Sequence, residues 1–316
     1  MRVLVTGASG WLGRTLVPRL RRGGHAVVGL DPRPGPETDV VGSVVDRPLL
    51  DRTLAEHGIT AVVHAGALHK PDVARLPARD FVAVNVQGTL NLLEASVAAG
   101  VDRFVFTSTT SLMINARIRA GRRGGATRAA WISEAMQPLE PRNIYGVTKL
   151  SAEHLCRLWS AEHGLPVVIL RTSRFFPEED DMAHEIEHST ANTKANEFLF
   201  RRLTVDDAAE AHLAALDRAP HLRFGCYILS APTPFAPEEC EALIEDAPAV
   251  VARHFPDYLD LYRRRGWTMF RSIDRVYSAR LAEDALGFRC RTDFAAILAD
   301  LRAGRATAAD VTPPET

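Results

Sequence analysis

Three glycines near the start of the chain constrain its fold more than any other feature of the sequence. They are Gly7, Gly10 and Gly13. They separate the short apolar segment Arg2–Thr6, a predicted strand, from Trp11–Arg22, a predicted helix. In this order a glycine loop can bind a pyrophosphate, because glycine permits close backbone approach and the helix N-terminus offers unpaired N–H groups. The spacing is one residue longer than in the commonest dinucleotide fingerprint, so a plain glycine-rich turn stays open as the alternative.

The first half of the sequence alternates between short apolar segments and longer helical ones. Such alternation is typical of a parallel sheet that is covered by helices on both faces. The predicted strands are Arg2–Thr6, Ala26–Leu30, Thr60–His64, Arg103–Thr107 and Pro166–Leu170, and the predicted helices are Trp11–Arg22, Asp80–Ala99 and Asn143–His163.

After Arg171 this alternation stops. Residues 172–197 are polar and irregular, and residues 230–303 are rich in helical patterns with several prolines. Between them we expect a strand at Phe198–Leu203, a helix at Val205–Asp217 and a last strand at Cys226–Leu229. We therefore expect a sheet domain (1–171 with 198–230), a smaller interleaved substrate lobe (172–197 with 231–305) and a loose tail (306–316).

The end of the second predicted strand carries a carboxylate, Asp31. At this place an acidic side chain can bind the ribose hydroxyls of NAD, and it would repel the 2′-phosphate of NADP. Arg33 could pair with such a phosphate or be solvated. We expect NAD, and NADP remains possible.

Tyr145 and Lys149 stand four residues apart in a predicted helix, so their side chains share one face. A half-buried tyrosine beside a solvated lysine would need no functional explanation. The alternative is that the ammonium group lowers the pKa of the phenol. Work as a base near pH 7 would need a shift of about 3 units from about 10, or roughly 4 kcal/mol.

Composition excludes several classes of function. The chain has 316 residues, is 46% hydrophobic and carries a formal net charge of −1, so bulk charge predicts neither a nucleic-acid nor a membrane-surface partner. The N-terminal sequence resembles no targeting segment and no apolar run could span a bilayer, so a cytoplasmic protein is expected by default. The four cysteines are widely spaced, which predicts neither a zinc ribbon nor a disulfide framework.

One short pattern points to different chemistry. His184, Glu185 and His188 fit H-E-x-x-H, in which two histidines bind zinc and the glutamate acts as base. The flanking residues are polar and irregular and no third ligand is evident, so we expect a substrate-contacting or solvated loop and no metal.

Several motifs occur together in one order along the chain. They are TGASGWLG at 6–13, Asp31, HAGA at 64–67, NVQGT at 85–89, FVFTST at 104–109 and YGVTK at 145–149. Together they resemble the extended short-chain dehydrogenase/reductase family, in its NAD-dependent nucleotide-sugar epimerase/dehydratase branch. The resemblance is strong over residues 1–175 and returns at RRLTVDDAAEAHLAAL (201–216). It implies a Rossmann-type doubly wound parallel sheet, NAD as cofactor and a nucleotide sugar as substrate.

Position by position, the resemblance also implies a set of functional residues. The catalytic residues would be Tyr145 as acid/base, Lys149, which also binds the nicotinamide ribose, and Thr109, which holds the substrate oxygen. Cofactor contacts would come from Gly7, Gly10, Trp11, Leu12, Gly13, Asp31, Arg33, Ser43, Val44, Ala65, Gly66, Ala67, Asn85 and Thr107, together with Tyr145 and Lys149. Substrate contacts are assigned to Ser108, Thr110, Arg174, Arg122 and Arg123.

The chain departs from the family pattern in three places. The segment between Thr109 and Tyr145 is long and rich in arginine, and could be a solvated loop or a lid that clamps an anion. Arg174 replaces an asparagine that often contacts the nucleotide-sugar phosphates, and it could hold an anionic substrate or pair with the acidic run 178–181. Thr110-Ser111 stands where the dehydratases of the family have Asp-Glu, which disfavours dehydration.

The expected activity is therefore NAD-dependent epimerisation of a sugar, nucleotide-linked in the leading interpretation. A net NAD(P)-dependent dehydrogenase or carbonyl reductase is the nearest alternative, and a non-catalytic nucleotide-binding protein is a third, since fold does not fix function. By the same resemblance, the helices 80–99 and 143–163 would pair with their copies in a homodimer.

Overall fold

The structure is a computed structural model, and it describes residues 1–175 and 189–311. Its centre is a seven-stranded sheet in the order β3-β2-β1-β4-β5-β7-β8, with every neighbouring pair parallel. The strands are β1 (Arg2–Thr6), β2 (Ala26–Asp31), β3 (Val40–Val41), β4 (Ala61–His64), β5 (Arg103–Thr109), β7 (Val167–Thr172) and β8 (Phe224–Leu229). This doubly wound arrangement confirms the predicted fold class, and the strand order reverses between β1 and β4.

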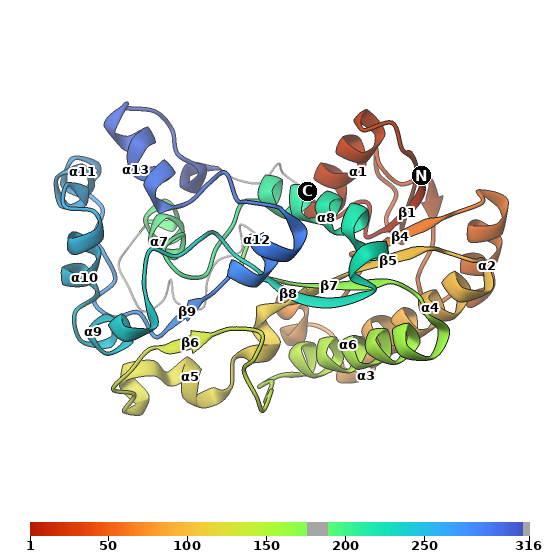
Figure 1. Ribbon diagram of the computed structural model, residues 1–316, viewed down its shortest axis with the longest axis horizontal. Helices are drawn as coiled ribbons and strands as arrows, with labels where there is room; N and C mark the ends of the chain where they lie inside the picture. Colours follow the sequence, from red (N-terminus) through yellow and green to blue (C-terminus); the bar gives the residue numbers. More distant parts are fainter. Residues whose placement is uncertain (176–188, 312–316) are drawn as a thin grey trace.

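Helices cover both faces of the sheet (Figure 1). The helices are α1 (Trp11–Arg22), α8 (Val205–Leu222) and α12 (Arg280–Leu286) on one face, and α2 (Arg47–Glu56), α4 (Gly88–Ala98) and α6 (Ile144–His163) on the other. Alternate residues of a central strand point to opposite faces: Val3 and Val5 pack with α1 and α8, whereas Leu4 packs with α2, α4 and α6. All three strand residues are fully buried, which explains the continuous apolar runs in the sequence.

The predicted helix at Asp80–Ala99 is not a regular α-helix throughout. It consists of α3 (Ala78–Phe81), a π-helical segment η2 (Val82–Gln87) and α4. The π-segment carries Asn85, whose side-chain amide bonds both backbone groups of Leu68 and the hydroxyl of Thr148. The apolar pattern of the sequence did not indicate this local widening, which is a short insertion in a helical run.

A second, helical lobe lies beside the sheet (Figure 1). Its core contains Phe198, Tyr258, Tyr262 and Phe294. Its elements include α7 (Thr190–Glu197), α9 (Cys240–Glu245), α10 (Ala247–His254), α11 (Tyr258–Arg265), α13 (Phe294–Arg302) and the short helical turns η6 (Pro237–Glu239) and η7 (Ala308–Asp310). We propose that this lobe and the sheet form the two units expected from the sequence.

The arginine-rich segment belongs to this second lobe. It forms α5 (Ala116–Ala120) and η4 (Gly121–Gly124), and continues into β6 (Ala130–Ile132), which pairs in parallel with β9 (Arg275–Tyr277). The backbone N–H of Ala129 bonds the carbonyl of Cys240. The segment is thus fixed by backbone pairing rather than being a solvated loop.

Two further expectations are corrected by the structure. The predicted strand at Phe198–Leu203 is wrong: the N–H groups of 198–201 bond carbonyls of 194–197, so the segment is a turn that leaves α7. Its apolar residues Phe198, Leu199 and Phe200 are buried in the second lobe, which gave the segment its strand-like composition. The predicted loose tail is held as far as Val311, whose carbonyl accepts a hydrogen bond from Lys194 Nζ (2.9 Å).

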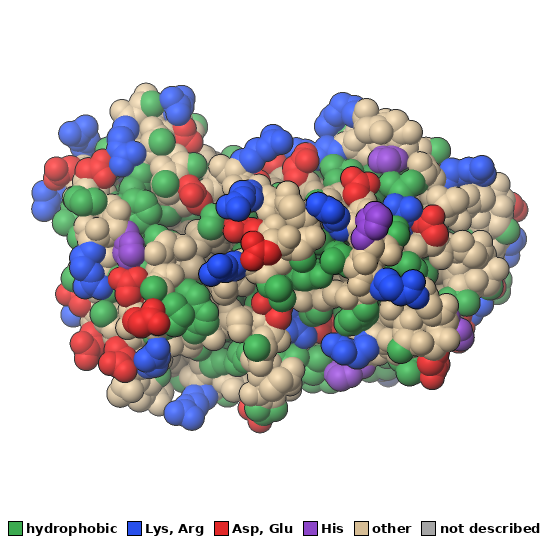
Figure 2. Space-filling view, in the orientation of Figure 1, with side chains coloured by type: hydrophobic (Ala, Val, Ile, Leu, Met, Phe, Trp, Pro, Cys, Tyr) green, Lys and Arg blue, Asp and Glu red, His purple; other side chains and the backbone are tan. Residues whose placement is uncertain are grey.

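None of the helices in the described part of the chain combines the length and apolar character needed to span a lipid bilayer. On the face of the molecule in Figure 2, acidic and basic side chains are interspersed, without a broad region of one sign.

Candidate active site

A cavity lies at the carboxyl ends of the central strands, where the sheet meets the second lobe. It gathers residues from β5, β7, α1 and α6 with residues of the second lobe. Predicted site residues that line it are Gly7, Gly10, Trp11, Leu12, Gly13, Ala65, Ala67, Thr107, Ser108, Thr109, Thr110, Tyr145, Lys149 and Arg174. The predicted cofactor loop and the predicted catalytic residues therefore face one common space, as the general rule for open α/β sheets requires.

The glycine loop leaves no room for side chains. Gly7 has a φ of +75°, and a Cβ there would lie 2.8 Å from the backbone nitrogen of Gly66. A Cβ on Gly13 would lie 2.2 Å from the carbonyl oxygen of Gly7. Gly10 forms the N-cap of α1 without a capping side chain. The loop thus presents bare backbone to the cavity at a helix N-terminus, which fits a dinucleotide pyrophosphate.

Asp31 ends β2 next to this loop, although it is not among the residues that line the cavity. Its two carboxylate oxygens accept hydrogen bonds from the backbone N–H of Ser9 (3.1 Å) and of Arg33 (2.9 Å). Each oxygen keeps a further acceptor position, so a ribose hydroxyl can still be bound. The side chain of Arg33 is 68% exposed, and its Nε lies 3.8 Å from Asp31 Oδ1.

Tyr145 and Lys149 occupy the first turns of α6. Asn143 caps this helix by accepting a hydrogen bond from the backbone N–H of Gly146 (2.9 Å). Lys149 is 2% exposed. Its Nζ donates a hydrogen bond to the carbonyl of Thr107 (2.7 Å) and lies 4.0 Å from the centre of the Phe106 ring. Burial lowers the pKa of Lys149 to about 8, so at pH 7 the ammonium form still predominates.

The hydroxyl-bearing residues at the end of β5 have different roles. Thr109 lies in the cavity wall, and its Oγ1 accepts a hydrogen bond from the N–H of Ser111 (3.0 Å) as the N-cap of η3 (Thr110–Met113). Its own hydroxyl proton can still be donated to a substrate oxygen. Ser108 instead donates to Glu153 Oε1 (2.6 Å). Glu153 is buried and forms a two-pronged ion pair with Arg171.

The other predicted site residues lie outside the lining. Ser43 and Val44 follow β3, Gly66 packs against Gly7 beneath the loop, and Asn85 is engaged with Leu68 and Thr148. Arg122 donates to the carbonyl of Glu245 in the second lobe (3.2 Å), and Arg123 is also absent from the lining. From the same segment, Arg119 lines the cavity.

Sequence reasoning missed several residues that line the cavity: His69, Lys70, Arg142, Arg201 and Arg275. His69 packs against Tyr145 with ring centroids 5.9 Å apart, and burial lowers its pKa to about 4. Arg201 follows α7 and opens the segment 201–216, which resembles the family, and Arg275 begins β9. No local pattern assigns Arg201 or Arg275 to the cavity wall, since their place depends on how the second lobe packs against the sheet.

His64, the first residue of the HAGA motif and the last of β4, lies beneath the glycine loop. Its ring nitrogens bond the hydroxyls of Thr6 (2.7 Å) and Thr89 (3.0 Å), and burial lowers its pKa to about 3. Thr6 Oγ1 in turn accepts a hydrogen bond from the N–H of Gly66 (3.0 Å). A neutral His64 thus supports the contact between Gly66 and Gly7.

The H-E-x-x-H pattern at His184–His188 lies outside the described residues. Within residues 1–175 and 189–311, no three His, Cys, Asp or Glu side chains form a group that could hold a metal ion.

Comparisons with known proteins show the family to which the chain belongs. The NAD dependent epimerase/dehydratase family matches residues 3–223. The UDP-glucose 4-epimerase of Azospirillum brasilense is 33% identical over 179 residues, which cover 54% of this chain and 48% of that protein. The L-arabinose 1-dehydrogenase (NAD(P)(+)) of Haloferax volcanii is 35% identical over 172 residues, or 54% of this chain and 65% of that protein. The chain thus spans about half to two thirds of the length of these relatives.

Solved structures extend the likeness over the whole fold. A short-chain dehydrogenase/reductase superfamily protein from Agrobacterium tumefaciens, solved with bound NAD, is 25% identical with a TM-score of 0.65, and 96% of each chain is covered. The UDP-N-acetylglucosamine 4-epimerase from Bacillus cereus shares the fold at 19% identity, also with a TM-score of 0.65, over 96% of this chain and 98% of that one. The resemblance to the extended short-chain dehydrogenases/reductases is confirmed. The chain belongs to the NAD dependent epimerase/dehydratase family.

Proposed function

We propose that this chain is an NAD-dependent enzyme that epimerises a nucleotide-linked sugar, with Tyr145 as acid/base. The observation that carries the proposal is the meeting of Tyr145, Lys149 and Thr109 with the bare glycine loop in one cavity. The residues fit the cofactor, because Gly7 and Gly13 leave a cradle that a Cβ would fill and the carboxylate of Asp31 ends β2 beside the glycine loop, where it could bind a ribose hydroxyl.

The residues of the chain would act in sequence on one sugar hydroxyl. Thr109 orients the oxygen by hydrogen bonding, and Tyr145 as phenolate takes its proton and later returns it. The buried ammonium group of Lys149 favours the phenolate. When bound, NAD supplies a reversible hydride acceptor. An epimerase differs from a dehydrogenase only in that the carbonyl product turns over in the cavity and is reduced on its other face.

A second candidate is a net dehydrogenase or a carbonyl reductase that uses NAD or NADP. It is favoured by the similarity to L-arabinose 1-dehydrogenase and by Arg174 in place of the asparagine expected from the resemblance. Dehydration is disfavoured, because Thr110 and Ser111 hold hydroxyls where an acid/base pair would be needed. A non-catalytic nucleotide-binding role would leave the gathering of Tyr145, Lys149 and Thr109 unexplained.

The experiment that tests the proposal uses purified protein, a panel of nucleotide sugars and sub-stoichiometric NAD. Sugar stereochemistry is followed by NMR and NADH by its absorbance in the same tube. A changed stereocentre without accumulating NADH supports an epimerase. Accumulation of NADH, or reaction only with a carbonyl compound and NADPH, supports the second candidate. Binding of NAD without turnover of any sugar contradicts both.

A further inference from the structure

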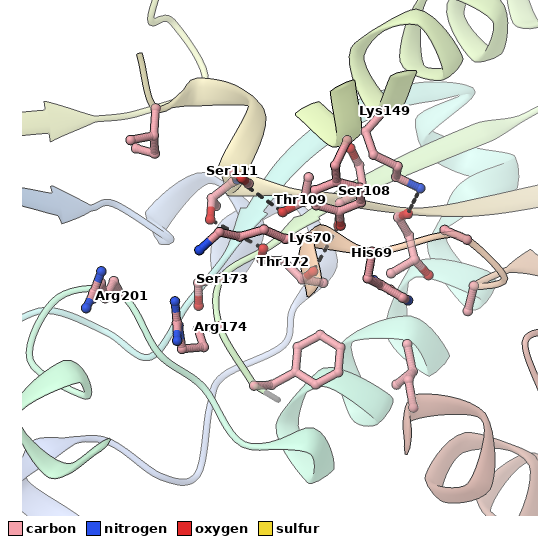
Figure 3. A pocket seen from close by; sticks show the side chains of 18 of the residues that line it. His69, Lys70, Ser108, Thr109, Ser111, Lys149, Thr172, Ser173, Arg174 and Arg201 are labelled. Atoms are coloured by element: carbon pink, nitrogen blue, oxygen red, sulfur yellow. Dashed lines mark hydrogen bonds between the residues drawn. The ribbon is translucent and has the colours of Figure 1, made fainter. Parts of the chain in front are cut away.

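Thr107 on β5 lines the cavity, and residues from both faces of the sheet hold its two oxygen atoms. The carbonyl oxygen accepts a hydrogen bond from Lys149 Nζ on α6 (2.7 Å), which is the dashed line at Lys149 in Figure 3. The side-chain Oγ1 lies 2.8 Å from Nε2 of His212 on α8, across the sheet. From the sequence, Thr107 was a candidate cofactor contact, whereas His212 had no assigned role.

The two partners of the His212 ring show where its proton lies. Nδ1 lies 2.7 Å from the carbonyl oxygen of Ala208, one turn earlier on α8, and a carbonyl only accepts hydrogen bonds. Nδ1 therefore carries a proton. His212 is fully buried, and burial lowers its pKa to about 4, so the ring is neutral at pH 7. A neutral ring has one proton, so Nε2 has none and can only accept a hydrogen bond.

This assignment fixes the direction of the bond between His212 and Thr107. Because Nε2 only accepts, the hydroxyl of Thr107 donates its one proton to it. The oxygen Oγ1 keeps its lone pairs but has no proton left for another bond. Towards a ligand, the hydroxyl of Thr107 is therefore an acceptor, which needs an N–H or O–H group of that ligand.

Thr109, two residues further along β5, has the opposite polarity. Its Oγ1 already accepts a hydrogen bond from the N–H of Ser111 (3.0 Å), so its proton remains available for a substrate oxygen. Residues two apart in a strand lie about 7 Å from each other. The end of β5 thus offers the cavity one acceptor, on Thr107, and one donor, on Thr109.

The position of Thr107 indicates which ligand would supply the donor. In the proposed function, the hydride acceptor must lie next to the sugar hydroxyl that Thr109 and Tyr145 hold. Thr107 is two residues from Thr109 and is bonded to Lys149, one helical turn from Tyr145. The nicotinamide half of NAD is therefore the part of the cofactor nearest to Thr107. That half carries two kinds of donor, the ribose hydroxyls and the N–H groups of the carboxamide.

We propose that His212 is a positioning residue, which orients the hydroxyl of Thr107 to accept a hydrogen bond from the nicotinamide half of NAD. His212 does not line the cavity, so it acts only through Thr107. This inference rests on the proposed function, because it assigns a cofactor contact in the same cavity.

Isothermal titration tests the inference without requiring turnover of a sugar. The three probes are NAD, its 3-acetylpyridine analogue and ADP. The analogue has a methyl group in place of the carboxamide nitrogen, and ADP lacks the nicotinamide half altogether. Thr107→Val keeps the shape of the side chain and removes the hydroxyl. We expect it to weaken NAD binding by about fivefold, as for one neutral hydrogen bond, and to leave ADP binding unchanged. Thr107→Ser keeps the hydroxyl and should retain the affinity for NAD.

Variants of His212 test its role as a positioning residue. His212→Leu removes the acceptor, so the Thr107 hydroxyl can turn, and we expect the same selective loss of NAD affinity. The double variant with Thr107→Val should bind NAD no more weakly than Thr107→Val alone, because His212 acts only through that hydroxyl. His221→Leu is the matched control, since His221 is an exposed histidine on the same helix. Circular dichroism and ADP affinity show that each variant is folded.

The outcomes identify the donor and separate the inference from the proposed function. If Thr107→Val weakens NAD but not the analogue, the donor is the carboxamide; if it weakens both, the donor is a ribose hydroxyl. Either result supports the inference. Unchanged NAD affinity in Thr107→Val, an equal loss for ADP, or losses that add in the double variant overturn it. If no sugar is turned over but the selective loss is found, the proposed function fails and the inference stands. If the wild-type protein does not bind NAD, both fail.

Discussion

The ammonium nitrogen of Lys149 lies 2.7 Å from the carbonyl oxygen of Thr107 and donates a hydrogen bond to it. This bond joins α6 to the end of β5, two residues before Thr109. The lysine is almost completely buried, so the fold holds a cation in place before any ligand arrives. Burial of that charge is unfavourable, as the lowered pKa of Lys149 records.

The first prediction concerns the free-energy cost of burying the charged side chain of Lys149. Lys149→Met should abolish turnover and make the ligand-free protein more stable at pH 7. A pKa lowered from 10.5 to about 8 corresponds to a penalty of about 3 kcal/mol, from which the lost bond to Thr107 must be subtracted. Urea unfolding of the two proteins measures the difference. A variant less stable than the wild type would contradict this explanation.

The same pKa predicts a pH dependence of stability. The unfolded lysine binds its proton up to about pH 10.5, whereas the folded lysine releases it near pH 8. Between these values the unfolded state holds more protons, so the contribution of Lys149 to stability rises with pH across this window and is constant below it. The stability advantage of Lys149→Met should therefore shrink from pH 8 to 10.

A second prediction concerns Tyr145. Tyr145→Phe should lower the rate of the chemical step by at least about a hundredfold, the range expected for loss of general acid/base catalysis. NADH affinity and the fold should change little, because the ring stays in place. Tyr258→Phe is the matched control: it also loses a buried hydroxyl, which bonds Pro248 in the second lobe. Full turnover by a folded Tyr145→Phe variant would exclude the proposed acid/base.

A third prediction concerns acid stability. His64 is buried with a pKa of about 3, against 6.5 in the unfolded chain. As pH falls below 6.5, His64 binds a proton in the unfolded state but not in the folded state, so the folded state loses stability. His64→Gln should reduce the slope of the unfolding free energy between pH 6 and 4.5 by up to about 1.4 kcal/mol per pH unit. His57→Gln, the same replacement at an exposed position, is the control variant.

These predictions use both what the sequence could predict and what it could not. The strands, the glycine loop and the pair Tyr145 and Lys149 follow from local patterns, since each depends on residues close together in the chain. The role of Ser108 could not be predicted, because its bond to Glu153 depends on how α6 packs on β5. Composition alone also could not separate a solvated loop from the backbone-paired segment that contains Ala129.

The cationic residues that line the cavity show this limit of prediction from the sequence more clearly. Arg174 was a candidate because it occupies a motif position. Arg201 opens a segment that resembles the family but has no role assigned there, and Arg275 lies in a segment without any motif. Arg122 and Arg123 seemed equally suitable from the sequence, yet Arg122 bonds the carbonyl of Glu245. Tertiary packing decides which arginines line a cavity, whereas the net charge of the chain says nothing about where each arginine lies.

A fourth prediction concerns cofactor choice. Asp31→Ala should weaken NADH binding by roughly tenfold and leave NADPH binding equal or tighter, because the ribose contact is lost and so is the repulsion of a 2′-phosphate. Quenching of protein fluorescence gives both affinities. Asp39→Ala is the control, since Asp39 also caps a backbone N–H in this region, that of Gly29. An unchanged ratio of affinities would show that Asp31 does not select the cofactor.

The last prediction concerns assembly, which we propose to be a homodimer through the faces of η2 and α6. Val147 and Leu158 on α6 are each 44% exposed, and Val82 on η2 is 47% exposed. Val147 and Leu158 stand eleven residues apart, about three turns, so they lie on one face of the helix. We expect sedimentation to give a dimer and the double variant Val147→Glu with Leu158→Glu to give a folded monomer, because two charges would enter the apolar contact. Leu259→Glu on α11 is the matched control, with a similar exposure of 43%, and should remain a dimer. A wild-type monomer would contradict the proposed dimer, and a dimer that survives the double variant would place the interface elsewhere.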